Sequence, residues 1–194
     1  MSRYRTRSWR AFEPPPGLRT AGTTQVRILG LDPGSRRTGF GLIESGAQLR
    51  VIAHGCLDVA HAAPAQRLRL IFEGLQRLLQ EHGPAEVAIE RVFVSRNVDS
   101  ALKLGQARGA ALCAIPAGVP VFEYAPRAIK LALVGSGAAE KLQVAHMVTA
   151  LLALRERPGA DAADALAAAI CHAHTRGRHL LAAAGVLGRA QGLG

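Results

Sequence analysis

Cysteine and aromatic residues are scarce in this chain of 194 residues, which has three cysteines and only 4% Phe, Trp and Tyr. The cysteines, at positions 56, 113 and 171, are odd in number and far apart, so they form neither a disulfide framework nor a zinc knuckle. No apolar run reaches the roughly 18 residues that a membrane span needs. The sequence therefore argues against a disulfide scaffold and a membrane partner, and we expect a cytoplasmic location.

Acidic residues are also few, since 14 Asp and Glu stand against 24 Lys and Arg and give a formal net charge of +10. This excess favours a polyanionic partner, and nucleic acid is the most common one. Hydrophobic residues make up 49% of the chain, which excludes disorder throughout and allows a core of Ala, Leu and Val. The length favours one domain.

Composition divides the chain into three segments. Residues 1–25 carry five Arg against one acid, and we expect a disordered basic tail there. A DNA-contacting arm is one alternative for this segment, and translation starting at Val26 is another. Residues 26–176 have the regular pattern of a folded domain. After Gly177 the pattern fades, which predicts a flexible C-terminal tail over residues 177–194.

Hydrophobic periodicity in residues 26–176 predicts strands first, and then alternating helices and strands. Short apolar runs predict strands at 26–32, 40–44, 50–59, 86–90 and 119–124. Apolar residues at helical spacing predict helices at 64–83, 97–114, from 126, at 140–154 and at 161–174. This order predicts an α/β domain with a mixed sheet and helices on both faces.

Two of the few acids, Asp32 and Glu90, end predicted buried strands. Ligands of open α/β sheets collect at the carboxyl ends of the strands, and neighbouring strands lie about 4.8 Å apart. On neighbouring parallel strands these carboxylates would repel each other unless one is protonated or a cation joins them, and Mg²⁺ is the simplest such cation. Asp32 is also a typical turn residue before Pro-Gly, whereas Glu90 has no local structural task.

A second pair of acids, Asp161 and Asp164, lies three residues apart at the start of the last predicted helix. Both face the same side of that helix, and the alanines around them allow a close approach to the sheet, so four acids can ring one site. The alternative is structural, with Asp161 as the N-cap and Asp164 as a complement to the helix dipole.

Sequence motifs from residue 26 to residue 174 form an ordered series. They are ILGLDPGSR from Ile28 with Thr38-Gly39, AIE at 88–90, NVDSALKLGQARG from Asn97, PVFEY from Pro120, AEK at 139–141 and ADAADAL at 160–166. This series resembles the RuvC-type Holliday-junction resolvases. The resemblance implies a ribonuclease-H-like fold with a mixed five-stranded sheet, a homodimer and a branch-migration complex as partner. It also implies Mg²⁺-dependent cleavage of four-way junction DNA in recombination and repair.

Carried over by position, the catalytic and metal-binding residues of the family fall on Asp32, Glu90, Asp161 and Asp164. Hydrolysis of a phosphodiester needs an activated water, an in-line approach and neutralised charge, and two metal ions about 3.5 to 4 Å apart supply all three. We expect Asp32 to bridge two Mg²⁺ ions, for which Mn²⁺ can substitute. Glu90 lies on one side, and Asp161 or Asp164 completes the other. The expected products of the paired nicks carry 5′-phosphate and 3′-hydroxyl ends.

Four further residues are candidates for contacts with DNA: Phe93, Lys130, Lys141 and His172. Phe93 lies in a predicted loop, where it either stacks on an unpaired base or packs in the core. The resemblance implies that Lys130 and Lys141 contact DNA, and the alternative is solvated charge. His172 lies eight residues after Asp164 and either contacts the phosphate, transfers a proton, or is an ordinary packed or surface histidine.

Gly105 and Gly109 lie four residues apart in a predicted helix and allow close packing, either against a second subunit or against their own sheet. Two other function classes remain alternatives. A junction- or RNA-binding protein needs the basic surface but not the acids. An actin-like ATPase needs a second lobe, for which this chain is too short.

Overall fold

The computed structural model describes residues 25–91 and 97–190, with side chains up to residue 177. The described part contains five strands and five helices. In chain order these are β1 (Val26–Asp32), β2 (Arg37–Ser45), β3 (Leu49–Asp58), α1 (Pro64–His82), β4 (Glu86–Glu90), α2 (Val98–Cys113), β5 (Val121–Tyr124), α3 (Pro126–Val134), α4 (Lys141–Leu151) and α5 (Ala160–Ala190). Pro64 and Pro126 stand in the first turns of α1 and α3, where a missing N–H costs no helical hydrogen bond.

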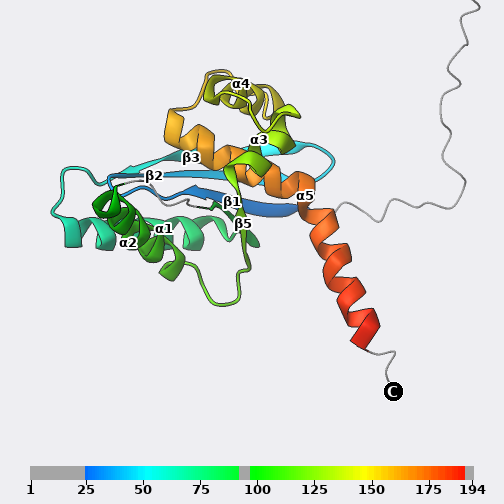
Figure 1. Ribbon diagram of the computed structural model, residues 1–194, viewed down its shortest axis with the longest axis horizontal. Coiled ribbons are helices and arrows are strands. Elements are labelled where there is room, and N and C mark those ends of the chain that lie inside the picture. The colour runs from blue at the N-terminus through cyan, green and yellow to red at the C-terminus, as the bar shows by residue number, and fades with distance from the viewer. Residues whose placement is uncertain (1–24, 92–96, 191–194) are drawn as a thin grey trace, which may run out of the picture.

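The five strands form one mixed sheet in the order β3-β2-β1-β4-β5. β1, β2 and β3 are antiparallel neighbours, whereas β4 is parallel to β1 and β5 is parallel to β4. Helices α1 and α2 cover one face, and α3, α4 and α5 cover the other (Figure 1). The predicted fold, a mixed five-stranded sheet with helices on both faces, is confirmed.

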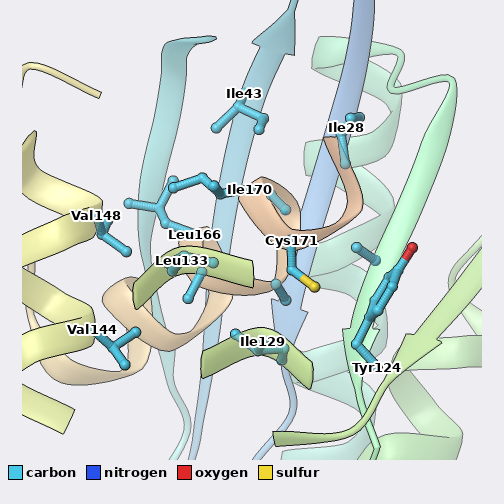
Figure 2. Close-up of a cluster of buried hydrophobic side chains, with 14 of the residues drawn as sticks. Ile28, Ile43, Tyr124, Ile129, Leu133, Val144, Val148, Leu166, Ile170 and Cys171 are labelled. Atoms are coloured by element: carbon cyan, nitrogen blue, oxygen red, sulfur yellow. The ribbon is translucent and has the colours of Figure 1, made fainter. Parts of the chain in front are cut away.

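Alternation along the strands sends side chains into two separate cores. Leu31 and Ile89 pack with α1 and α2, whereas Ile28 and Ala88 pack with α3, α4 and α5. Figure 2 shows this second core, with Ile28 beside residues of α5. Because successive side chains of a strand point to opposite faces, the last residues of β1 and β4 lie on the α5 side.

Helix α5 crosses β1 and β2 so closely that no side chain fits between them. A Cβ atom at Gly30 would lie 2.0 Å from the carbonyl oxygen of Ala165, and one at Gly39 would lie 2.0 Å from that of Asp161. Glycine is therefore required at both positions, since only a residue without a Cβ allows this approach. The contact sets the first turn of α5 directly over the sheet.

The last helix is longer than the sequence predicted. α5 continues to Ala190, beyond the last helix that the sequence predicted over 161–174, while the flexibility of the segment after Gly177 stays a prediction. Residues 180–184 are Leu-Leu-Ala-Ala-Ala, all good helix formers, and the cost of about 1 kcal/mol for a glycine at position 177 does not end the helix. Despite the length of α5, no helix in the described ranges is long and apolar enough to cross a membrane. Residues 1–24 and 191–194, parts of the two predicted tails, lie outside the described residues.

Candidate active site

Asp32 and Glu90 lie side by side at the carboxyl ends of β1 and β4, two inner strands of the sheet. β1 and β4 are parallel, and Leu31 is paired with Ile89, so the next residue of each strand is one of these two acids. Both carboxylates lie on the face covered by α5. The condition that the sequence reasoning set for a joint site, namely that the two strands are parallel neighbours, is therefore met.

The two carboxyl groups have raised pKa values. Burial raises the pKa of Asp32 to about 6, and the charge of Asp164 adds to the rise. Burial also raises the pKa of Glu90 to about 7, with a further contribution from the charge of Asp32. The ammonium of Lys141 opposes both shifts. Negative charge is thus concentrated in a partly desolvated place, which a divalent cation would relieve.

Helix α5 contributes Asp164 to the same place. Its carboxylate is 24% exposed and accepts a hydrogen bond of 2.8 Å from the Nζ of Lys141, the first residue of α4. Asp32, Glu90, Asp164 and Lys141 line one cleft of about 460 Å³, which we call the carboxylate cleft. The structure therefore brings three of the four predicted acids together.

Asp161, the fourth predicted acid, turns toward β2 and β3. Its Oδ2 lies 3.3 Å from the Nε of Arg37 and accepts a hydrogen bond from the Sγ of Cys56 at 3.6 Å. Its charge still reaches Asp32, whose pKa it helps to raise. Because α5 begins at Ala160, Asp161 lies inside the helix, and its alternative role as the N-cap is wrong.

Lys130 and Lys141 border the carboxylates. Both line a smaller hollow of about 160 Å³ that shares Glu90 and Asp164 with the carboxylate cleft. The side chain of Lys141 is 80% exposed, so it can reach a ligand in the cleft without burial. Phe93, another of the four predicted contacts with DNA, lies outside the described residues.

His172 does not face the carboxylate cleft, and its predicted contact with DNA is wrong. The side chain is fully buried, with its Nε2 2.6 Å from Glu86 and its Nδ1 2.6 Å from the hydroxyl of Tyr124. Its ring also stacks on Phe122. Eight residues along a helix return to a similar direction but lie about 12 Å farther along the axis, which here leads away from the acids.

Sequence reasoning missed Arg37, Cys56 and Arg108, which also surround the acids. Arg108 comes from α2 and donates a hydrogen bond of 2.6 Å to the carbonyl oxygen of Glu90, and its Nη2 lies 2.8 Å from Glu123 of β5. It thereby joins α2 to the ends of β4 and β5. Arg108 belongs to the GQARG motif, but no spacing in the sequence tells where an arginine on α2 points.

The donor set fits a hard divalent cation. Carboxylate oxygens are the ligands that Mg²⁺ prefers, and the raised pKa values mark a local excess of negative charge. Among residues 25–91 and 97–177, no three His, Cys, Asp or Glu side chains are yet close enough to hold one ion. Side-chain cations contact two of the acids instead, Lys141 at Asp164 and Arg37 at Asp161.

A mixed sheet of the ribonuclease-H type, whose adjoining strands end in acids beneath the two aspartates that begin α5, is the arrangement expected of a metal-dependent nuclease. The family model described as "Crossover junction endodeoxyribonuclease RuvC" matches residues 28–172. A curated protein of that name from Halorhodospira halophila is 58% identical over 160 residues, which cover 81% of this chain and 96% of the relative. The chain belongs to the RuvC family of crossover junction endodeoxyribonucleases and is an enzyme.

Solved structures agree with this assignment. The structure described as "T. thermophilus RuvC in complex with Holliday junction substrate" matches with a TM-score of 0.70 and 34% identity, over 77% of this chain and 94% of that one. The yeast mitochondrial Holliday junction resolvase Ydc2 matches with a TM-score of 0.57 over 80% of this chain and 82% of that one. Its identity is 11%, so it supports the fold alone.

Proposed function

We propose that this protein is a Mg²⁺-dependent endonuclease that resolves Holliday junctions by paired, symmetric nicks in recombination and DNA repair. The observation that carries the proposal is the joint position of Asp32, Glu90 and Asp164 in one cleft. The family, the junction bound to the Thermus relative and the net charge of +10 support DNA as the substrate.

Asp32, Glu90 and Asp164 would hold the metal ions, with Asp161 turning from Arg37 to join them. Two Mg²⁺ ions, or Mn²⁺ in their place, would activate a water and neutralise charge on the phosphate and on the leaving 3′ oxygen. Without a cation, the pKa of about 7 leaves Glu90 partly protonated near neutral pH, whereas Asp32, with a pKa of about 6, is mostly ionised, and the proton on Glu90 must leave when a cation binds. The products then carry 5′-phosphate and 3′-hydroxyl ends.

Lys130 and Lys141 would hold the DNA backbone at the cleft. Each ammonium is a mobile point charge on a long stem, suited to a phosphate whose position changes during the reaction. Lys141 is the better placed of the two, since it already lies 2.8 Å from Asp164 while remaining 80% exposed. Phe93 remains a proposal for stacking on an unpaired base.

A homodimer would explain paired nicks, and the outer side of α2 supports one. Val98 is 80% and Leu102 is 62% exposed, although both are large apolar residues. Gly105 and Gly109 share this side, and apart from their chain neighbours and the backbone of their own helix, no atom of the described residues lies within 4 Å of the place where a Cβ would stand on either of them. Glycines at these two positions would let a second subunit pack closely against α2, and a two-fold dimer would place two active sites on one junction.

The remaining expectations follow from the family resemblance and the composition. We propose a branch-migration complex as a partner and the cytoplasm as the place of action. We also propose that residues 26–176 form the catalytic domain and that residues 1–25 form a basic tail.

Cutting of a synthetic mobile four-way junction, mapped to the nucleotide with and without Mg²⁺, tests the function. We expect symmetric nicks only with the metal. Asp32→Asn and Glu90→Gln should abolish cutting and preserve junction binding, because each keeps the shape and removes the charge. Glu73→Gln is the matched control, since Glu73 lies on α1 and pairs with Arg69. Binding without any metal-dependent nick would instead favour a structural junction-binding protein, and stabilisation by a nucleotide would favour an ATPase.

A further inference from the structure

A second hollow lies beside the carboxylate cleft and is lined by donors and cations. Its volume is about 480 Å³, and we call it the basic hollow. It is formed by the turn after β1, the start of α1 and one side of α2. Its polar lining residues are Ser35, Arg36, Arg67, Ser100, Lys103 and Gln106. No Asp or Glu of the described residues lines it, so its net positive charge favours the binding of an anion.

Two of the three cations in the basic hollow have no acidic partner. In the described ranges, neither Arg36 nor Arg67 forms an ion pair with a carboxylate. Arg67 is also held in place, because it donates hydrogen bonds to the carbonyl oxygens of Ala62 at 2.7 Å and Ala60 at 3.1 Å. A fixed guanidinium without a counter-charge is ready to bind an anion, since little side-chain entropy remains to be lost.

Lys103, the third cation, is available as well. Its Nζ lies 2.6 Å from Asp99, but the two side chains are 55% and 68% exposed. An exposed pair of this kind is worth only about 0.2 to 1 kcal/mol, so Lys103 can exchange Asp99 for a ligand at little cost.

The basic hollow adjoins the carboxylate cleft on two independent elements. In the turn after β1, Pro33 and Gly34 line the cleft, and the next residue, Ser35, lines the hollow. On α2, Leu104 lines the cleft, and its neighbour Lys103 lines the hollow. A DNA strand that places one phosphate at Asp32 would therefore bring a nearby phosphate of the same strand to the hollow.

We propose that the basic hollow is a second phosphate-binding site, which holds a backbone phosphate of the strand being cut, next to the phosphate that reacts. This inference rests on the proposed junction cleavage and adds a subsite to it. Arg36 and Arg67 offer planar guanidinium donors, which match phosphate oxygens in pairs, and Ser35 and Ser100 add hydroxyl groups. Such a contact carries no sequence information but fixes the register of the strand on the acids.

Charge removal tests the site, with junction affinity and cleavage kinetics as separate readouts. Arg36→Gln should weaken junction binding by roughly three- to tenfold and lower the slope of log Kd against log salt by about 1. KM should rise while kcat changes little, because Arg67 and Lys103 still hold the register of the strand and Arg36 lies outside the carboxylate cleft. Arg50→Gln removes the same charge from β3, where Arg50 pairs with Glu44, and should change neither value comparably. Equal effects of the two substitutions would overturn the proposal.

Neutral methylphosphonates, placed one at a time along the junction strands, identify the phosphate. The wild-type protein should lose affinity at one position of the cut strand near the scissile phosphate, and Arg36→Gln should lose no more at that position. A strongest effect on an uncut strand, or additive losses at every position, would overturn the assignment. Cutting by the wild-type protein in the same series tests the proposed function separately. If it cuts normally while Arg36→Gln binds like the wild type, only the second site fails.

Discussion

Replacing Asp32 by Asn should make the metal-free protein more stable while abolishing its activity. The folded chain holds the carboxyl group of Asp32 in a partly desolvated cleft beside Asp164, and both features oppose its ionisation. The unfolded chain exposes the same group to water. Ionisation of Asp32 therefore favours unfolding, and an amide of the same shape removes this effect.

The size of the gain follows from the shift in pKa. The pKa of Asp32 rises from 3.8 to about 6, and one unit corresponds to about 1.36 kcal/mol. We expect a gain in the free energy of unfolding of about 1 to 3 kcal/mol, the upper value being the full shift. Asp32→Asn should also lower the pKa of Glu90, because the charge of Asp32 contributes to its rise.

The pH dependence gives the sign. Well below pH 3.8 Asp32 is protonated in both states, so the wild type and Asp32→Asn should approach equal stability as the pH falls toward that range. As the pH rises from about 4 to about 6, the wild type loses stability, because its folded state keeps a proton that its unfolded state has already released. The gap between the two proteins should therefore open over this range and stay level above it.

Urea unfolding in EDTA at several pH values between 4 and 8, followed by circular dichroism, measures the gap. Added Mg²⁺ should stabilise the wild type and have less effect on Asp32→Asn, since a ligand that binds the folded state alone stabilises it. Glu73→Gln serves again as the control and should show no such gap. An Asp32→Asn protein no more stable than the wild type at pH 8 would refute the reasoning.

Three further substitutions test the fold, the corrected histidine and the dimer. Gly39→Ala places a Cβ 2.0 Å from the carbonyl oxygen of Asp161, so it should cost about 1 to 3 kcal/mol in urea unfolding and most of the cutting. Gly118→Ala, which meets open space, should change neither, and equal behaviour of the two would contradict the close packing of α5. His172→Phe removes two buried hydrogen bonds and should lower the free energy of unfolding by about 2 to 4 kcal/mol, while the folded protein still cuts the junction. Loss of cutting without loss of stability would instead support a contact between His172 and DNA. Leu102→Glu should give a monomer by light scattering and unpaired nicks, and a dimer that persists would place the interface elsewhere.

The parts of the site that the sequence predicted depend on local signals. Asp32 and Glu90 end short apolar runs, and strand ends are where a sheet exposes side chains to a ligand. The spacing of Asp161 and Asp164 correctly put both acids in the first turns of one helix. The sequence did not predict that β1 pairs with β4; the structure supplies this parallel pairing, which places the first two acids side by side.

The parts that were missed depend on contacts between residues far apart in the chain. Asp161 turns aside because β2 and β3 bring Arg37 and Cys56 to it, which no spacing around Asp161 reveals. Helical periodicity indicated on which side of α5 His172 lies, but not that its side chain is fully buried. Its buried ring contacts Glu86, which lies 86 positions earlier in the chain. The glycine at 177 suggested an end to α5, but helix formers on both sides outweigh one glycine.

The close contact between α5 and the strands at Gly30 and Gly39 contains only main-chain atoms. The spacing between the acids of the helix and those of the strands is therefore set by atoms that every amino acid shares. Apolar residues elsewhere in the two cores can change over evolution, with their volumes compensating one another, and leave that spacing intact. The spacing of the acids therefore does not depend on most side chains of the cores. It depends on glycine at positions such as 30 and 39, where even a methyl group is too large.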